Sequence, residues 1–368
     1  MNIGFLGDCV LKTPHNHKIG TQLQNELSEC GIIAINFEAP ISCEAGVAIH
    51  KSGPHHNQSS DAPAWLERCG VNVVSLANNH IMDYGVESLN ATINSFEHSK
   101  TVGVGNYTTA YNPTVIELDG VKIAFFAATH QEFGGVDIRS TDSIGTANAT
   151  SSKLLLSIKK AAEVYDRVFV IVHAGIEYLD APLPEWREIY KSYIDMGADG
   201  VIGSHPHVPQ GWEIYQGKPI IYSLGNFLFE IPERPKLWYH SNLAIIDSHT
   251  LEVRLIPLHY DYQNKIVDVD YSGDSQQHND YLVTLLNHDK QYNEYIDKSI
   301  RELKRVYEGM LRRGGNMEIR EKMKNLIRPL LGKPLYVTDS VHFLNMIQCE
   351  SHRWVTERLI KEGLLKLN

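Results

Sequence analysis

Two histidines separated by one proline, His205-Pro206-His207, follow an apolar run that ends at Gly203. Alternate side chains of an extended segment point to the same side, so the two imidazoles are predicted to project side by side. Pro206 disfavours helix at His205 and stiffens the pair. Two imidazoles fixed together at the end of a buried strand are suited to hold a metal ion. The alternative is a surface turn that contains two histidines by chance.

Polar residues follow the apolar runs elsewhere in the chain in the same way. They are Asp8, Glu38, Asn79-His80, His173 and Asn226. Ligands of open α/β sheets bind beyond the carboxyl ends of the strands, so these groups are predicted to converge. Carboxylates, imidazoles and an amide oxygen together suit Zn, Mn or Fe better than Ca or Mg alone. Two such ions about 3.5–4 Å apart, bridged by a shared carboxylate, could orient a phosphoryl group and activate water.

Each of these residues also has a purely structural interpretation. Asp8 could cap a helix, Glu38 could be a surface carboxylate, and Asn79 could be a turn residue. His173 could be a core histidine whose hydrogen bonds are satisfied. Because all of them are predicted at the same edge of a sheet, we favour a common site over coincidence.

The elements that must position these residues are short strands that alternate with amphipathic helices. This order predicts a layered α/β fold. Residues 41–60, which include His50, Lys51, His55 and His56, are predicted to form a long loop over a site. The expected strands are 2–6, 32–37, 71–76, 101–104, 113–118, 121–127, 168–172, 200–203, 219–224, 242–247 and 251–257. The expected helices are 19–29, 62–69, 86–98, 151–164 and 184–196.

A polar, punctuated segment at 271–280 predicts a boundary between a domain of residues 1–270 and a helical region of residues 281–368. One apolar stripe of this region is formed by Tyr292, Ile296, Leu303, Tyr307 and Met310, and a second by Ile319, Met323 and Ile327. Such stripes are typical of helices that pack against other elements. Residues 281–368 carry 16 Lys and Arg against 11 Asp and Glu, a basic excess that is either a solvated face or a surface for an anionic polymer or membrane.

Composition and charge exclude several classes of protein. The 368 residues are 43% hydrophobic and 21% charged, as in ordinary globular proteins, and no apolar run approaches the roughly 20 residues of a membrane span. Residues 1–280 carry 18 Lys and Arg against 33 Asp and Glu, which argues against a general nucleic-acid-binding surface. Five cysteines without a Cys-x-x-Cys pair, and an N-terminus that reads as a strand instead of a signal peptide, predict a cytoplasmic protein.

Several motifs together resemble one known family. They are Gly7-Asp8, Asn36-Phe37-Glu38, Ser75-Leu76-Ala77-Asn78-Asn79-His80 with Asp83 and Gly85, His173-Ala174-Gly175-Ile176-Glu177-Tyr178, Gly203-Ser204-His205-Pro206-His207 and Tyr222-Ser223-Leu224-Gly225-Asn226-Phe227. In this order, over about residues 1–260, they resemble the CapA (poly-γ-glutamate capsule biosynthesis, PGA_cap) branch of the calcineurin-like metallophosphoesterases. The resemblance implies a four-layer αββα sandwich with a dinuclear metal centre, followed here by a C-terminal helical extension.

The resemblance also implies roles for individual residues. Asp8 and His207 would bind one metal ion, and Glu38 would bridge to a second ion that is bound by Asn79, His173 and His205. His80 would be the acid that protonates the leaving group, or it would stabilise the transition state, a role that suits an imidazole near neutral pH. Asp83 and Glu177 would orient the histidines. Lys51, Glu177 and Asn226 are the residues expected to face an anionic substrate.

The chain departs from the wider superfamily at two ligand positions. Those phosphoesterases open with Asp-x-His, whereas this chain has Asp8-Cys9-Val10, and Glu38 stands where they usually have Asp. Both changes are typical of the CapA branch, and they leave one metal ion short of a ligand. CapA-type proteins often carry an N-terminal membrane anchor, whereas this chain starts directly at the first predicted strand. Residues 281–368 lie outside the resemblance.

The leading hypothesis is therefore a phosphoesterase-type hydrolase that uses two divalent ions (Mn, Zn or Fe) in synthesis or processing of an anionic polymer such as poly-γ-glutamate. A second hypothesis uses the same centre on an amide or a carbon acid, where it would stabilise an oxyanion. A third is a non-catalytic assembly subunit of a capsule synthase, for which synthase components would be the partners.

Overall fold

The structure is a computed structural model that describes residues 1–140, 142–232, 234–315 and 340–365. The chain divides into two compact units, and each is described by itself. The first unit comprises Met1–Ile49 and His55–Tyr292, and the second comprises His50–Pro54 and Asn293–Asn368.

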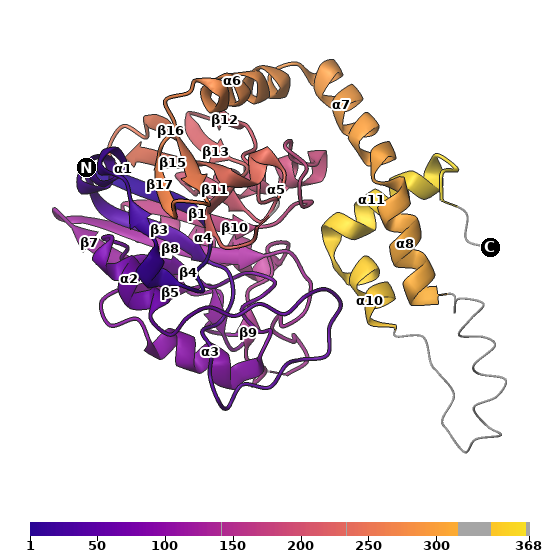
Figure 1. Cartoon of the computed structure of the whole chain (residues 1–368), viewed down its shortest axis with the longest axis horizontal. Coiled ribbons are helices and arrows are strands. Elements are labelled where there is room, and N and C mark those ends of the chain that lie inside the picture. The colour runs from indigo at the N-terminus through magenta and orange to yellow at the C-terminus, as the bar shows by residue number, and fades with distance from the viewer. Residues whose placement is uncertain (141, 233, 316–339, 366–368) are drawn as a thin grey trace. The chain divides into compact units, whose positions relative to one another are not determined.

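The first unit is built on two large β-sheets (Figure 1). In the nine-stranded sheet, β1 and its neighbours β3, β4, β5 and β14 run parallel. On the other side, β15, β16 and β17 pair antiparallel, and β2 pairs parallel with β17 at the edge. The strand order is β2 (Lys18–Ile19), β17 (Ile266–Val269), β16 (Val253–Asp261), β15 (His240–Asp247), β1 (Asn2–Val10), β3 (Cys30–Phe37), β4 (Val73–Ser75) and β5 (Lys100–Val102), with β14 (Asn226–Phe229) paired to β1.

The six-stranded sheet has a parallel centre and antiparallel edges. Its order is β12 (Trp212–Tyr215), β13 (Lys218–Ile221), β11 (Gly200–Ser204), β10 (Arg167–His173), β8 (Val121–Thr129) and β7 (Thr114–Leu118). The strands expected at 113–118 and 121–127 pair as β7 and β8. They are joined by Asp119-Gly120, whose φ of 53° and 77° is the left-handed pair that suits a two-residue hairpin loop. A small sheet pairs β6 (Val104–Gly105) with β9 (Gly145–Thr146).

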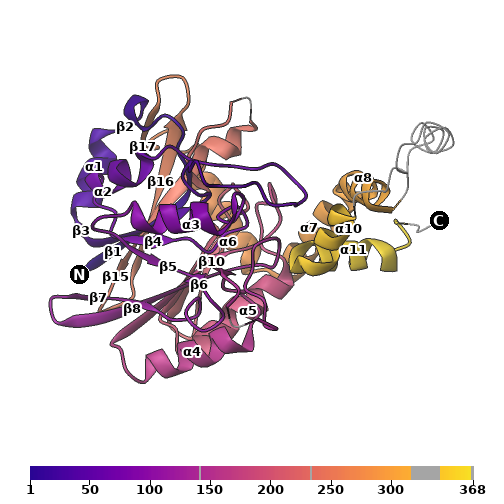
Figure 2. The same ribbon diagram turned by 90° about the horizontal axis from the view of Figure 1, so that it is seen from below.

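Helices cover the outer faces of the two sheets. In Figure 2, α1 (Thr21–Ser28), α2 (Ala62–Arg68) and α3 (Gly85–Asn94) lie on one side of the sheets. The helices α4 (Ser152–Ala162) and α5 (Pro184–Asp195) lie on the other side (Figure 2). Two 3-10 turns, η1 (Pro14–Asn16) and η2 (Lys236–Tyr239), complete the connections.

Two hydrophobic clusters hold these layers together. One lies between the sheets, where Phe5 of β1 contacts Phe125 of β8 and Phe169 of β10 at ring-centroid distances of 6.3 and 5.5 Å. The other joins the nine-stranded sheet to its helices, for example through Leu23 of α1 and Trp65 of α2. Because helix, sheet, sheet and helix pack in turn, the predicted four-layer αββα sandwich is confirmed.

Several strands extend beyond their predicted ends, and this changes how the polar residues are placed. Strand β1 continues to Val10, so Asp8 lies within a strand, and β8 continues to Thr129. The prediction that Asn226 follows the carboxyl end of strand 219–224 is wrong. Strand β13 ends at Ile221, the chain crosses to the other sheet, and Asn226 is the first residue of β14, opposite Asp8.

Helix α6 (Asp274–Leu286) begins inside the segment 271–280 that the sequence marks as a boundary. It packs on β12 and β16 of the first unit. Two residues of α6 and three residues of neighbouring segments form a group of mostly buried polar side chains, which we term the α6 cluster: His240, Asn242, Asp270, Ser275 and Asn279. Polar residues can therefore belong to a helix that is packed against the body of the protein.

The C-terminal helices are α7 (Asp289–Glu302), α8 (Lys304–Gly315), α10 (Val341–Gln348) and α11 (Glu350–Lys361), and α10 packs on α8 and α11. Tyr292, Ile296 and Tyr307 of the first predicted stripe are buried, as expected for a packing face. The second predicted stripe, Ile319, Met323 and Ile327, lies outside the described residues. Within the described ranges, we find no helix that is both long and apolar enough to span a membrane.

Candidate metal centre

Six of the predicted site residues come together in one buried group, which we term the strand-end cluster. Asp8 lies in β1, Glu38 directly follows β3, and His173 is the last residue of β10. The others come from the turns after β4 and β11. The full set is Asp8, Glu38, Asn79, His173, His205 and His207, each at most 6% exposed. The residues come from both sheets, so the site is formed where the carboxyl ends of two sheets face each other.

Two glycines allow the backbone segments around the cluster to approach closely. A Cβ atom on Gly7 would lie 1.8 Å from the carbonyl oxygen of Gly225. A Cβ atom on Gly203 would lie 1.9 Å from the carbonyl oxygen of Tyr222. The backbone N–H of Asp8 donates to the Gly225 oxygen at 3.0 Å, so the carboxylate is anchored by its own main chain. Substitution of Gly7 or Gly203 by any other residue would force these backbone segments apart.

The segment His205-Pro206-His207 is not extended, which corrects the sequence-based prediction. His205 and His207 have φ of 98° and 61°, a region that side chains other than glycine adopt at a cost of about 1–3 kcal/mol. The turn directs the backbone N–H of His205 to Asp8 Oδ2 at 2.9 Å. The two rings are 5.9 Å apart at an interplanar angle of 45°. The side chains of His205 and His207 therefore do not lie side by side, and each belongs to a different group of potential metal-binding atoms.

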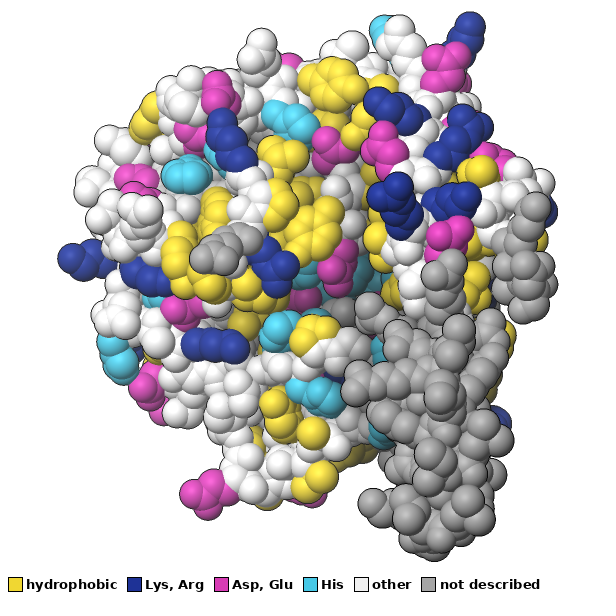
Figure 3. Space-filling view, turned by 45° about the vertical axis from the view of Figure 1, so that its right-hand side comes forward, with side chains coloured by type: hydrophobic (Ala, Val, Ile, Leu, Met, Phe, Trp, Pro, Cys, Tyr) yellow, Lys and Arg dark blue, Asp and Glu magenta, His cyan; other side chains and the backbone are white. Residues whose placement is uncertain are grey.

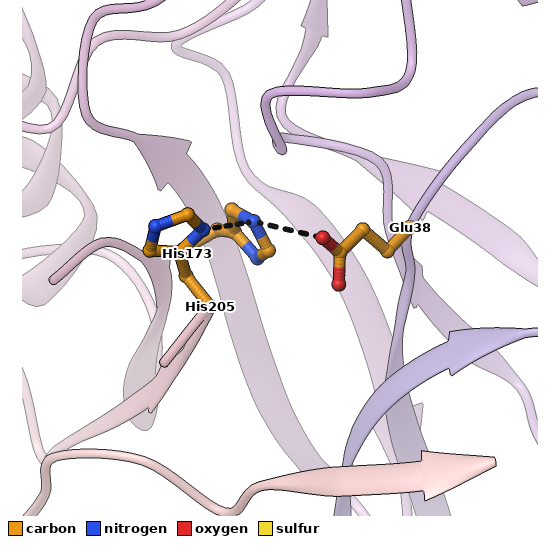
Figure 4. A group of neighbouring side chains, drawn as sticks. All are labelled: Glu38, His173 and His205. Carbon is orange, nitrogen blue, oxygen red and sulfur yellow. Dashed lines mark hydrogen bonds and ion pairs between the residues drawn. The ribbon is translucent and has the colours of Figure 1, made fainter. Parts of the chain in front are cut away.

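His173 contacts three other members of the cluster through one ring nitrogen. Its Nε2 lies 3.0 Å from Asn79 Oδ1, 3.1 Å from His205 Nδ1 and 3.6 Å from Glu38 Oε1. Figure 4 shows His173, His205 and Glu38 pointing toward one another. Ligand atoms about 2.0–2.2 Å from a tetrahedral metal ion lie roughly 3.3–3.6 Å from each other. The 3.6 Å between His173 Nε2 and Glu38 Oε1 lies in this range, whereas the contacts of 3.0 and 3.1 Å are hydrogen-bond distances.

Glu38 is shared by two groups of potential metal-binding atoms. One consists of Glu38, His173 and His205, the other of Asp8, Glu38 and His207, and within each group the donor atoms lie within 4.8 Å of one another. Glu38 Oε1 lies 3.6 Å from His173 Nε2 and 3.7 Å from His207 Nε2. The donors present therefore fit two divalent ions with a bridging carboxylate, as the resemblance implies.

Asn226 orients the ring of His207. Its Nδ2 donates to the carbonyl oxygens of His207 and Trp238, both at 3.1 Å, so its Oδ1 is an acceptor that lies 3.0 Å from His207 Nδ1. The Nδ1 of His207 must then carry the proton, which leaves the Nε2 lone pair facing Glu38. Hydrogen bonding of the second ring nitrogen is the usual support for a metal-binding histidine. The substrate contact expected of Asn226 remains a prediction.

Two groups of the cluster have pKa values that suit metal binding. Burial alone would raise the pKa of Asp8. The hydrogen bond and charge of His173, the charge of His207 and the N–H of His205 hold it below its ordinary value. Burial lowers the pKa of His173 to about 4, although Asp8 opposes this shift. An ionised carboxylate and a neutral imidazole are the forms that bind a metal ion.

The position of the missing superfamily histidine is apolar. Val10 is fully buried and packs in a hydrophobic cluster with Ala39, Phe229 and Trp238. The ring of Trp238 also contacts that of His207, at a centroid distance of 4.7 Å. A valine side chain offers no donor atom, so this position adds no ligand to the Asp8 group.

His80 and Asp83 form a buried pair beside the cluster. His80 Nδ1 lies 2.7 Å from Asp83 Oδ2, which also accepts the backbone N–H of His56 at 2.7 Å. The ring of His56 packs edge-on against that of His80 at 4.5 Å. His56 comes from the loop at residues 41–60, so this part of the loop reaches the predicted catalytic histidine. The orienting role predicted for Asp83 matches its hydrogen bond to His80.

The other predicted residues are placed differently. Glu177 follows β10, and its side chain is exposed, unlike those of the cluster. Lys51 belongs to the short segment His50–Pro54 that is grouped with the second unit. Their roles therefore stay predictions. On the face of the molecule drawn in Figure 3, histidine side chains, in cyan, lie among hydrophobic side chains, in yellow.

Two buried residues of the site were not predicted from the sequence. Asn36, in β3, donates from Nδ2 to Asp8 Oδ1 at 2.7 Å, and the same atom lies 3.1 Å from His173 Nδ1. His130 directly follows β8, and its ring lies 4.3 Å from that of His205. His130 obeys the same strand-end rule as the other residues, but the predicted strand stopped at residue 127.

Comparisons with known proteins agree on one family. The family model described as bacterial capsule synthesis protein PGA_cap matches residues 3–231. Over 213 residues the chain is 32% identical to the capsule biosynthesis protein CapA of Bacillus anthracis, covering 55% of this chain and 52% of that protein. Over 202 residues it is 30% identical to the PGA biosynthesis protein CapA of Bacillus subtilis strain 168, covering 54% and 53%. The chain thus spans about half the length of these curated relatives.

The fold also has partial counterparts among solved structures. A hypothetical protein from Thermus thermophilus superposes with a TM-score of 0.45 at 17% identity, covering 70% of this chain and 99% of that one.

Proposed function

The chain belongs to the bacterial capsule synthesis protein family PGA_cap, and we propose that its first unit is a metal-dependent hydrolase of the phosphoesterase type. The observation that carries this proposal is the buried Glu38, which is shared by two donor groups. The position of this carboxylate between two imidazole nitrogens, at 3.6 and 3.7 Å, supports a site in which two divalent ions would share Glu38.

In this proposal, Asp8 and His207 hold one divalent ion (Mn, Zn or Fe), and Asn79, His173 and His205 hold the other. When bound, such ions polarise a phosphoryl oxygen and lower the pKa of water to near neutrality. Glu38 holds the two positions together, while Asn36 and Asn226 keep Asp8 and His207 in place through the hydrogen bonds described above.

His80 supplies the proton to the leaving oxygen. As water bonds to phosphorus, the bond to the leaving oxygen breaks, and the imidazolium of His80 gives up its Nε2 proton to that oxygen. Asp83 accepts the Nδ1 hydrogen bond at 2.7 Å, so it fixes the tautomer and stabilises the positive charge before transfer. A His–carboxylate pair adjacent to the ligand Asn79 is well placed for this step.

The substrate is an anionic ester or polymer met in capsule synthesis, and Lys51 is proposed to contact it through its positive charge. The catalytic domain is proposed to be residues 1–270, with residues 281–368 as an accessory region. Components of a capsule synthase are the proposed partners. The support for this part is the family membership, since the relatives are named for capsule and PGA biosynthesis.

The first experiment is metal analysis of protein that was purified without added metal, followed by hydrolysis of p-nitrophenyl phosphate with Mn²⁺ or Zn²⁺. The wild type is compared with His205→Ala/His207→Ala and with His80→Ala. A matched control is the double variant His98→Ala/His249→Ala, since both side chains are exposed. We expect about two equivalents of metal in the wild type and the control, and loss of metal in the cluster variant. His80→Ala should retain metal and lose activity.

Other results would point to other functions. Full metal occupancy without phosphatase activity, with turnover of an amide or carbon acid, would replace the reaction but keep the centre. No metal after reconstitution with Mn²⁺ and Zn²⁺ would exclude the metalloenzyme and favour an assembly subunit of a capsule synthase.

A further inference from the structure

The end of strand β8 is joined to the strand that carries His173. Thr129 Oγ1 and the backbone N–H of His130 both donate to the carbonyl oxygen of His173, at 2.9 and 3.1 Å. The strands β8 and β10 are paired in parallel up to Thr129 and His173. The residues that follow β8 therefore leave the sheet directly beside the metal-binding histidines.

His130 and Glu132 extend the cluster on the far side of His205. His130 is 1% exposed, and its ring packs edge-on against that of His205. His130 Nε2 lies 3.4 Å from Glu132 Oε1. One donor atom from each of His130, Glu132 and His205 lies within 4.8 Å of the other two. A carboxylate and an imidazole are thus within reach of a ring nitrogen of His205.

His205 faces His173 through one ring nitrogen. Its Nδ1 lies 3.1 Å from His173 Nε2, in the group that also contains Glu38 and Asn79. An imidazole has a second ring nitrogen, and in the inference below Nε2 of His205 is assigned to the side of His130 and Glu132. A metal-binding histidine that donates its second N–H to a carboxylate is held in orientation and becomes a more basic ligand.

His205 and His207 differ in the side chains that lie next to their rings. His207 is held by the neutral amide of Asn226, whereas His205 is next to a pair that includes a carboxylate. A carboxylate adds negative charge near a bound cation, which a neutral amide does not. The two metal positions should therefore differ in what fixes their affinity.

We propose that Glu132, together with His130, is the positioning element for His205 and sets the affinity of the metal ion that His173 and His205 bind. This inference rests on the proposed function, because it requires a metal ion at that position. Glu132 acts through His205 and is not itself a ligand.

The test is calorimetric titration of the metal-free full chain with Mn²⁺. The variants are Glu132→Gln, which keeps the volume but removes the charge, and Glu132→Asp, which restores a carboxylate with a shorter reach. Glu163→Gln, an exposed carboxylate at the end of α4, is the matched control. His130→Gln is a second route to the same effect, and circular dichroism checks that each variant is folded.

We expect Glu132→Gln and His130→Gln to weaken one of two Mn²⁺ binding steps by about 10- to 100-fold and to leave the other within about twofold. Glu132→Asp should lose less than Glu132→Gln, and the control should match the wild type. The inference is overturned if both steps are unchanged in folded Glu132→Gln and His130→Gln. A third Mn²⁺ in the wild type that Glu132→Gln loses would also overturn it, because Glu132 would then be a ligand. A wild type that binds no Mn²⁺ would contradict the proposed function and this inference together.

Discussion

The strand-end cluster and the α6 cluster are both buried groups of polar side chains in the first unit, but their hydrogen-bonding chemistry differs. In the α6 cluster, donors face acceptors. Asn242 and Asn279 exchange amide hydrogen bonds at 3.3 and 2.7 Å. Ser275 hydrogen-bonds both to Asp270 and to His240 Nδ1.

In the strand-end cluster, Asp8 accepts hydrogen bonds from Asn36 and from the N–H of His205, but the atoms around Glu38 lie farther apart than hydrogen-bonded atoms do. The lone pair of His207 Nε2 and the carboxylate of Glu38 lie 3.7 Å apart, and Glu38 is also 3.6 Å from His173. Buried acceptors that converge in this way need a cation between them, whereas buried donor–acceptor pairs satisfy each other. Burial of polar groups alone therefore does not identify a site, and the pairing of donors and acceptors does. The four predictions below test this distinction.

The largest effect is expected for Glu38→Gln. An amide keeps the shape of the side chain but cannot bridge two cations, so several kcal/mol of transition-state stabilisation should be lost. Activity on p-nitrophenyl phosphate should fall by about 1,000-fold or more, at about 1.4 kcal/mol for each factor of ten. Metal analysis of the same sample should show loss of both ions. Wild-type metal content and activity in Glu38→Gln would contradict the bridging role.

Removal of metal should destabilise the wild type. An ion present at about 1,000 times its Kd stabilises the folded state by about 4 kcal/mol. We therefore expect a chelator to lower the Tm measured by calorimetry, and added Mn²⁺ to restore it. Asp8→Asn should have little or no metal-dependent shift, and Asn279→Ala should retain the wild-type shift. Equal shifts in the two variants would remove the distinction between the clusters.

Asn279→Ala should destabilise the protein whether or not metal is present. The substitution leaves the buried amide of Asn242 without its partner, at a cost of about 1–3 kcal/mol. Urea unfolding with and without Mn²⁺ measures the free energy of unfolding. Gln277→Ala, exposed on the same helix, is the control and should change it by about 0.5 kcal/mol or less. A cost that appears only with Mn²⁺ would link the α6 cluster to the metal site.

The smallest effect concerns pH. Burial, and then the charge of His259, lowers the pKa of His240 from its ordinary value, although Asp270 opposes this shift. As the pH falls below about 6.5, the unfolded chain takes up a proton at this histidine first, so stability is lost. In chelator, the fall in Tm between about pH 7.5 and 5.5 should be smaller in His240→Gln than in the wild type. An equal fall would exclude this contribution.

Much of the fold could be predicted because the spacing of hydrophobic residues, and the polar residues at the ends of strands, are visible within short stretches of sequence. The strands near Ile3, Ile33 and Val170 were recognised from short apolar runs, and Asp8, Glu38 and His173 from the polar residues that end them. The ends of the elements differ from the predicted ones, because tertiary pairing extends a strand beyond its apolar core. The predicted strand stops two residues before the observed end of β8, so His130 could not be recognised as a residue that directly follows a strand.

Which strands pair with one another could not be predicted from neighbouring residues in the sequence. Asn226 was assigned to the wrong strand, because the crossing between Ile221 and Asn226 follows from pairing with β1, which is more than 200 residues away in sequence. The left-handed turn at His205 and His207 is likewise imposed by Asp8, which accepts the backbone N–H of His205. Neither contact leaves a mark in the neighbouring residues.

The sequence by itself determined the types of donor atom and the strands that carry them, because side-chain chemistry and the period of apolar residues are local properties. Only the tertiary structure decided which donor atoms are grouped together, with Glu38 between two imidazoles. It also decided that His130 and Glu132 lie next to His205. The physical reason is that these distances depend on two sheets packing face to face through a core such as Phe5, Phe125 and Phe169. That packing is a property of the whole first unit, and no single segment of the chain contains it.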